Sequence, residues 1–185
     1  MDFGVVTFGA ASGAEWREKA LKFEAAGLDY LFLPDHIGVF DPFSAAASAA
    51  ATTSRLRVGT LVLNVEFWNP LLLAPAAVTT QLVADGRFVL GLGAGHARVE
   101  FEQAGLSYRS PAARVRQLAD VAQVVPRLVA GETVDDEELG LHGASLGLAP
   151  TRVPVLIGGN ATACCGWQHD MRTSSAWSAS RRAPN

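Results

Sequence analysis

Apolar and polar positions alternate along the chain in two regular ways as far as about residue 160. Five short, nearly continuous apolar runs predict strands of a parallel sheet covered on both faces; they span residues 3–8, 28–33, 56–63, 88–92 and 153–157. Helical spacing or Ala-rich composition predicts four helices between them; these span residues 15–26, 43–52, 71–83 and 111–125.

This alternation predicts an α/β fold, in which the chain forms the first five strands of a TIM-type (β/α)8 barrel. A complete doubly wound sheet is the alternative, because five parallel strands are enough for one. Pro111 suits the first turn of the last helix, whereas Pro126 predicts that this helix kinks or ends early. Residues 133–147 form a mostly polar insert.

Residues 161–185 follow neither pattern. They contain both cysteines, Cys164 and Cys165, and two of the four tryptophans. With GC-rich codons, the loss of one base can produce this tail from another reading frame. The restored frame reads HRLLRLAARHADIVGLV, which predicts an amphipathic helix followed by an apolar strand. We therefore expect residues 1–160 to be the N-terminal part of a barrel domain and residues 161–185 to be a frameshifted, non-native or disordered tail. A real but unusual terminal segment is the alternative.

Composition narrows the classes of function. The chain has 185 residues, 49% of them hydrophobic, with a mean hydropathy of +0.20 and a formal net charge of −3. This charge gives no electrostatic basis for binding nucleic acid or an anionic membrane. No apolar run approaches the roughly twenty residues of a membrane span, and the start carries no cationic signal segment, so a cytoplasmic protein is expected. The adjacent cysteines indicate neither a disulfide framework nor a metal site.

Polar and glycine residues follow four of the five predicted strands. In both candidate folds the carboxyl ends of the strands carry the chemistry. Asp35 and His36 follow the second strand, and residues 63–66, 93–100 and 158–160 follow the next three, so all four segments should converge on one mouth. A histidine beside a carboxylate can exchange protons near neutral pH. The alternative is that Asp35 caps a turn while His36 is a solvated loop residue.

Two further patterns lie near this mouth. The segment GLGAGH at residues 91–96 partly matches a dinucleotide-binding fingerprint but lacks its acidic partner. It favours a close approach of the backbone to a ligand, with a simple sharp turn as the alternative. Glu100 and Glu102 are expected to be exposed helix carboxylates, and the backbone N–H groups of Gly158 and Gly159 could cradle a phosphate.

Five blocks of the sequence together resemble the luciferase-like flavin-dependent oxidoreductases, especially the branch that uses the deazaflavin coenzyme F420. The blocks are DFGVVTFG, GLDYLFLPDH, RLRVGTLVLN, NPLLLAPAAVTTQLVADGRFVLGLGAGH and VPVLIGGN, in order over residues 2–160. The resemblance implies a TIM-type barrel of roughly 250 residues or more, of which this chain would lack about the last third to half.

The resemblance also implies roles for individual residues. Asp35 and His36 would contact the deazaflavin, with His36 as the catalytic proton donor or acceptor. Leu61 and Val62 match the bulge of the third strand, where such enzymes often place a non-prolyl cis peptide against the coenzyme ring.

Two more positions are informative. Gly158 and Gly159 match the backbone that lines the tail of the coenzyme. His96 departs from the family, because it stands where the sugar-phosphate dehydrogenase relatives carry a catalytic glutamate. The acid of those relatives, and with it their substrate, is therefore not assigned to this chain.

The implied function is F420-dependent hydride transfer to or from a small organic substrate. An FMN-dependent monooxygenase that activates O₂ is the alternative within the family. A third reading is that the chain of 185 residues is an open half-barrel with little or no activity. Such a half-barrel would expose apolar faces and unpaired strand edges, which favours aggregation or a homodimer.

Overall fold

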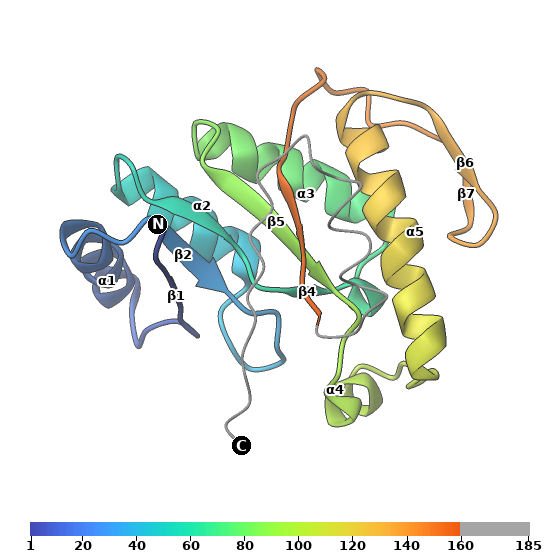
Figure 1. Cartoon of the computed structure of the whole chain (residues 1–185), viewed down its shortest axis with the longest axis horizontal. Helices are drawn as coiled ribbons and strands as arrows, with labels where there is room; N and C mark the ends of the chain where they lie inside the picture. Colours follow the sequence, from blue (N-terminus) through green and yellow to red (C-terminus); the bar gives the residue numbers. More distant parts are fainter. Residues whose placement is uncertain (160–185) are drawn as a thin grey trace.

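The computed structural model describes residues 1–159 and has a parallel sheet at its centre (Figure 1). The strands of this sheet are β1 (Gly4–Val6), β2 (Tyr30–Leu33), β3 (Arg57–Thr60), β4 (Leu63–Asn64), β5 (Phe88–Gly93) and β8 (Val155–Ile157). The helices are α1 (Gly13–Ala25), α2 (Pro42–Thr52), α3 (Pro70–Val83), α4 (Arg98–Gln103) and α5 (Pro111–Val129), with a 3-10 turn η1 (Val65–Phe67). Every predicted strand and helix is therefore present.

Neighbouring strands of the sheet also follow one another along the chain. The order is β1, β2, β3, β5 and β8, and each pairing is parallel. β3 and β4 are two parts of one strand, because both pair with β5. A doubly wound sheet instead reverses its order at a switch point. The sequential order is that of a TIM-type barrel and excludes the doubly wound alternative.

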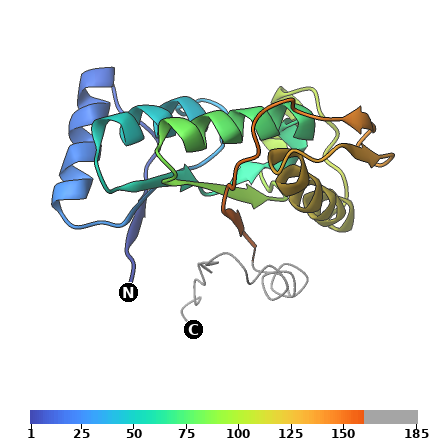
Figure 2. The same ribbon diagram turned by 90° about the horizontal axis from the view of Figure 1, so that it is seen from above.

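The helices α1, α2 and α3 lie together on one side of the sheet (Figure 2). Leu31 and Leu33 of β2 are fully buried in the core that these helices and α5 form with the sheet. Tyr30 and Phe32 alternate with them along the strand, and their rings stack on each other with centroids 5.4 Å apart. Because side chains alternate across a strand, this aromatic pair belongs to the inner side of the partial barrel.

Polar side chains fix where four of the helices begin. A side-chain oxygen accepts a backbone N–H of the first turn in each of them; the capping residues are Ser12, Asp41, Asn69 and Ser110. The last three precede a proline, whose missing N–H costs no bond in a first turn. These caps set the lengths of the loops that leave the carboxyl ends of the strands.

One local prediction was wrong in part. A kink or an early end of the helix was expected at Pro126, and the early end does not occur, because α5 continues to Val129. The side chains of Leu128 and Val129 are buried in the core, and their packing outweighs the one backbone hydrogen bond that a proline removes. The third predicted strand is interrupted between β3 and β4, at the Leu61–Val62 bulge that the resemblance implies.

Two elements add detail to the sequence reading. The polar insert folds into an antiparallel hairpin of β6 (Val134–Asp136) and β7 (Leu141–Ala144), seen beside α5 in Figure 1. The short helix α4 was not predicted as a separate element. It leads away from the end of β5, so it carries residues of the 93–100 segment to the mouth.

The tail predicted to be frameshifted, residues 161–185, lies outside the described residues, and the division at residue 160 stays a prediction. Within residues 1–159, none of the helices combines the length and the apolar character needed to cross a membrane.

Candidate functional site

A cavity of ≈ 140 Å³ opens where β2, β4 and β5 end. Its walls are formed by Asp35, His36, Leu61, Val62, Asn64, Gly95, His96 and Glu100. Three of the four segments expected at the mouth therefore meet there, because the carboxyl ends of adjacent parallel strands share one edge of the sheet. The fourth segment, with Gly158 and Gly159, does not line this cavity.

Asp35 is held at the end of β2 by two donors to a single oxygen. Its Oδ2 accepts the backbone N–H of Asn64 at 3.0 Å and the indole N–H of Trp68 at 2.9 Å. Burial raises the pKa of the Asp35 carboxyl, and these hydrogen bonds and the neighbouring His36 offset the rise only in part. The carboxyl thus ties β2 to the segment after β3 instead of capping a local turn.

His36 contacts a carboxylate that was expected to be exposed. Its Nδ1 lies 2.8 Å from Oε1 and 3.1 Å from Oε2 of Glu100, although 64 residues separate the two. The Glu100 side chain is only 14% exposed, against 32% for His36. The expectation of an exposed helix carboxylate was therefore wrong for Glu100, since α4 turns this residue toward the end of β2. His36 is likewise not a simple solvated loop residue.

His96 and Glu102, which follow the same strand β5, behave differently. The His96 ring meets the His36 ring edge to face, with centroids 5.7 Å apart. Glu102 is exposed, as expected, and pairs with Arg98 one turn earlier on α4 at 2.8 Å. The cavity therefore contains two imidazoles and two carboxyl groups, a set able to accept and donate protons.

The break between β3 and β4 forms one wall of the cavity. The peptide bond between Leu61 and Val62 is cis, as expected from the resemblance. The Val62 side chain lies over three glycines of neighbouring strands: a Cβ atom would meet a Val62 methyl at 3.3 Å from Gly91, 2.3 Å from Gly93 and 2.7 Å from Gly158. The glycines of the 91–96 segment thus allow a close approach by Val62, as well as the turn at the end of β5.

A buried cation supports the loop after β5. Arg114 of α5 is 7% exposed and donates its Nε–H to the carbonyl of Gly95 at 3.3 Å and a second N–H to the carbonyl of Arg109. Its guanidinium carbon lies 4.2 Å from the centre of the Tyr108 ring, within the range of a cation–π contact. Sequence reasoning missed Arg114, because arginine on an amphipathic helix usually marks the solvated face.

The two remaining predicted residues, Gly158 and Gly159, are not part of the cavity wall. Gly158 donates its backbone N–H to the carbonyl of Leu92 at 2.9 Å and lies beneath the Val62 side chain. Gly159 is exposed. Within residues 1–159, no three histidine, aspartate, glutamate or cysteine side chains gather in a way that could hold a metal ion.

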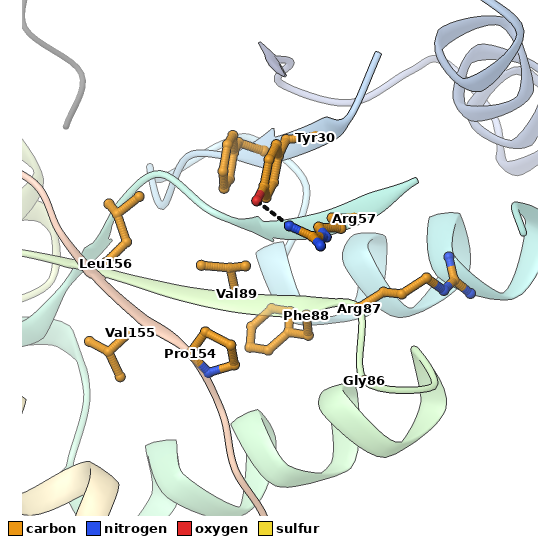
Figure 3. A pocket seen from close by; sticks show the side chains of 10 residues that line it. Tyr30, Arg57, Gly86, Arg87, Phe88, Val89, Pro154, Val155 and Leu156 are labelled. Carbon is orange, nitrogen blue, oxygen red and sulfur yellow. Dashed lines mark hydrogen bonds between the residues drawn. The ribbon is translucent and has the colours of Figure 1, made fainter. Parts of the chain in front are cut away.

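A second hollow of ≈ 170 Å³ lies at the opposite, amino ends of the strands (Figure 3). Tyr30, Arg57, Val89, Pro154 and Leu156 are among its lining residues, and Arg57 donates to the Tyr30 hydroxyl at 2.6 Å. This hollow is larger, but it contains none of the four acid–base groups. In barrel folds the amino ends serve stability, so we place the chemistry at the carboxyl ends.

A sequentially wound β/α half-barrel with acid–base groups at its carboxyl mouth belongs to the class of TIM-type barrel enzymes. The chain belongs to the luciferase-like monooxygenase family, whose model matches residues 1–164.

Individual relatives agree with this membership. The chain is 33% identical over 137 residues to 5,10-methylenetetrahydromethanopterin reductase of Archaeoglobus fulgidus, covering 73% of this chain and 40% of the reductase. It is 30% identical over 127 residues to an F420-dependent glucose-6-phosphate dehydrogenase of Amycolatopsis mediterranei, covering 64% of this chain and 38% of that enzyme. The solved structure of a monooxygenase from Streptomyces bottropensis has a TM-score of 0.72 and 26% identity, covering 88% of this chain and 54% of that one. The chain thus spans about two fifths to one half of the length of these relatives.

Proposed function

We propose that this chain carries the coenzyme-contacting part of a luciferase-like oxidoreductase that uses coenzyme F420 for hydride transfer to or from a small organic substrate. One observation carries the proposal: the His36 and Glu100 pair opens into the same cavity as the glycine-backed Val62. A proton-exchanging group and a closely packed apolar wall are the two things that oriented hydride transfer needs from a protein.

The residues around the cavity fit a flat coenzyme ring. Three glycines lie behind Val62, so its side chain is held from behind and half-exposed toward the cavity. Such a side chain can support the face of a ring without moving. We propose that Leu61 and Val62 back the ring, while Asp35 and His36 meet its edge. When bound, a deazaflavin supplies the carbon that accepts or releases the hydride.

Gly158 and Gly159 are proposed to contact the tail of the coenzyme. Their backbone follows β8, one strand beyond the cavity, and their N–H groups are the kind of donor that phosphate oxygens accept. The described residues form a cavity of only ≈ 140 Å³, which is small for a whole coenzyme. The proposal for these residues is therefore limited to the part of the coenzyme next to Val62 and β8.

His36 is proposed to move the proton that accompanies the hydride. In the oxidative direction the imidazole takes the proton that a substrate hydroxyl loses, and in the reductive direction it returns this proton. A histidine suits this role because its ordinary pKa lies near neutral pH. His96 is exposed and lines the same cavity, and no role in the reaction is proposed for it.

An FMN-dependent monooxygenase that activates O₂ is the second candidate function. The name of the family and the monooxygenase from Streptomyces bottropensis favour it, whereas the F420-dependent dehydrogenase relative favours the first. The same cavity could serve either ring system, since Val62 offers shape and no specific hydrogen bond.

Equilibrium titration of the purified chain with F420 and with FMN, followed by coenzyme fluorescence, tests both candidates. F420 is expected to bind more tightly than FMN, and H36A is expected to weaken binding at least severalfold. H142A, on the exposed part of the β6–β7 hairpin, is the matched control and should bind as the unchanged chain does.

Tighter binding of FMN would favour the monooxygenase. Binding of neither coenzyme would refute the proposal for this chain and favour the half-barrel without catalytic function. Light scattering during the same experiments would show whether the chain is a homodimer, which we propose only on the ground of its open sheet edges.

A further inference from the structure

The contact between His36 and Glu100 determines which ring nitrogen of the histidine carries a proton. An ionised carboxylate can only accept hydrogen bonds, so the nitrogen that faces it must be a donor. Both carboxylate oxygens lie within 3.1 Å of Nδ1, and within residues 1–159 no hydrogen bond engages Nε2. In the neutral imidazole, Nδ1 therefore holds the proton and Nε2 keeps its lone pair.

The other ionisable groups that face this histidine do not compete for Nδ1. Asp35 precedes it in the chain, but its Oδ2 already accepts two N–H groups from Asn64 and Trp68. His96, from the loop after β5, approaches ring against ring with an interplanar angle of 88°. Glu100, from α4, is thus the one carboxylate of the cavity wall that holds the ring by a hydrogen bond.

The two glutamates of α4, Glu100 and Glu102, lie in different surroundings. Glu102 forms a solvent-exposed ion pair with Arg98 of the same helix. Glu100 instead loses most of its water contact, and a half-buried carboxylate is costly unless it is paired. Its position is therefore explained by its partner, since the interaction with His36 offsets the cost of burial.

We propose that Glu100 is a positioning residue that fixes His36 in the Nδ1–H tautomer and leaves Nε2 as the nitrogen that exchanges protons with the substrate. Throughout the exchange Nδ1 keeps its proton and its bond to Glu100. Nε2 gains one proton when the substrate loses one, and the resulting imidazolium is stabilised by the carboxylate. This inference rests on the proposed function only for the identity of the proton donor, since the tautomer is a property of the chain alone.

Nitrogen-15 NMR of the histidine rings tests the tautomer directly, in the full chain without coenzyme. The spectrum is recorded at alkaline pH, about two units above the usual histidine pKa. H36Q identifies the signals of His36 by their disappearance. The expected result is a protonated Nδ1 and an unprotonated Nε2. A proton on Nε2 in the unchanged chain would overturn the proposal, and this outcome does not depend on the folding of any variant.

Two variants on α4 separate positioning from a structural role. E100A should remove the preference for Nδ1–H, so that His36 takes the mixture of tautomers of a free imidazole. E102A removes a carboxylate from the same helix and should leave the His36 signals unchanged. If E100A also leaves them unchanged while the amide spectrum shows a folded chain, Glu100 does not set the tautomer and the proposal fails.

The coenzyme titration is read separately. If the tautomer depends on Glu100 but F420 does not bind, the positioning stands and the proposed function falls. If F420 binds and the tautomer does not depend on Glu100, the function stands and the positioning falls.

Discussion

Trp68 donates its indole N–H to Asp35 over 2.9 Å and so joins the 3-10 turn after β4 to the end of β2. The same Asp35 oxygen also accepts the backbone N–H of Asn64. A single atom thus holds together two strand ends of the cavity. Both donors are neutral, so a neutral acceptor of the same shape could replace the carboxylate without breaking either bond.

Replacement of Asp35 by asparagine is expected to stabilise the chain at neutral pH. Burial raises the pKa of this carboxyl, so the folded state favours its protonated form. The stability that Asp35 contributes is therefore present below its unfolded pKa and is lost as pH rises through the folded value. D35N avoids this loss and should raise the free energy of unfolding by about 1 kcal/mol at neutral pH.

Denaturant unfolding of D35N and the unchanged chain at neutral pH and at about pH 3 checks this sign. The gain should shrink at the lower pH, where the native carboxyl is protonated in both states. A gain of equal size at both values would contradict the argument. F420 binding should weaken in the same variant, because Asp35 is proposed to contact the coenzyme. The carboxyl would then cost stability but serve binding.

The Val62 side chain and the glycines beneath it are expected to be energetically coupled. A Cβ at residue 93 would lie 2.3 Å from a Val62 methyl, which forces one of the two to move. G93A should therefore destabilise the chain by about 1 to 3 kcal/mol, as overpacking does. V62A removes that methyl, so G93A should cost less when introduced into V62A.

A double-mutant cycle measured by thermal or denaturant unfolding gives this coupling. An interaction energy of about 1 kcal/mol or more is expected. G13A is the control, because a Cβ at this first residue of α1 meets nothing closer than an arginine nitrogen at 3.4 Å. Strict additivity of G93A and V62A would show that the close approach does not exist in solution.

The periodic part of the molecule could be predicted from sequence, because burial on two faces imposes apolar runs on strands and three-to-four spacing on helices. The end of β2 could be predicted for the same reason, and so could the position of Asp35 and His36 at the mouth. A carboxyl end is defined as soon as its strand is defined.

Glu100 and Pro126 show why the rest could not be predicted. Helix α4 has six residues and no side-chain cap, so its direction depends on tertiary contacts that no local pattern encodes. Glu100 is consequently indistinguishable by spacing from the exposed Glu102. The proline rule likewise describes an isolated helix, whereas α5 is held past Pro126 by the burial of Leu128 and Val129.

The carboxylate of Glu24 is expected to stabilise the turn before β3. Its Oε1 accepts the backbone N–H groups of Ser54 at 3.0 Å, Arg55 at 2.8 Å and Leu56 at 2.9 Å. Partial burial would raise the pKa of Glu24, but the donors of this turn outweigh it and lower the pKa. E24A should reduce the free energy of unfolding by about 1 to 2 kcal/mol at neutral pH.

Because the folded pKa is lowered, the contribution of Glu24 is present above the unfolded value and is lost as pH falls through the folded one. The difference between E24A and the unchanged chain should therefore shrink toward about pH 3 in the same unfolding experiment. E18A, which removes an exposed carboxylate of the same helix, is the control and should have little effect. A loss of stability for E24A that is independent of pH would mean that the charge of Glu24 does not contribute to the stability of this turn.

Arg114 is expected to couple the stability of the chain to the shape of the cavity. Its buried guanidinium donates to the carbonyls of Gly95 and Arg109, and leucine at this position would remove both hydrogen bonds. R114L should cost about 2 to 4 kcal/mol in the free energy of unfolding. R116L lies two residues further on the exposed side of α5 and should be nearly neutral.

The distinguishing result concerns His36. Gly95 lies in the loop that leads to His96 and α4, so loss of its anchor should also loosen the contact between His36 and Glu100. The nitrogen-15 signals of His36 in R114L should then shift toward those of E100A, whereas R116L should resemble the unchanged chain. If R114L lowers stability and leaves the His36 signals unchanged, Arg114 supports the fold but not the geometry of the site.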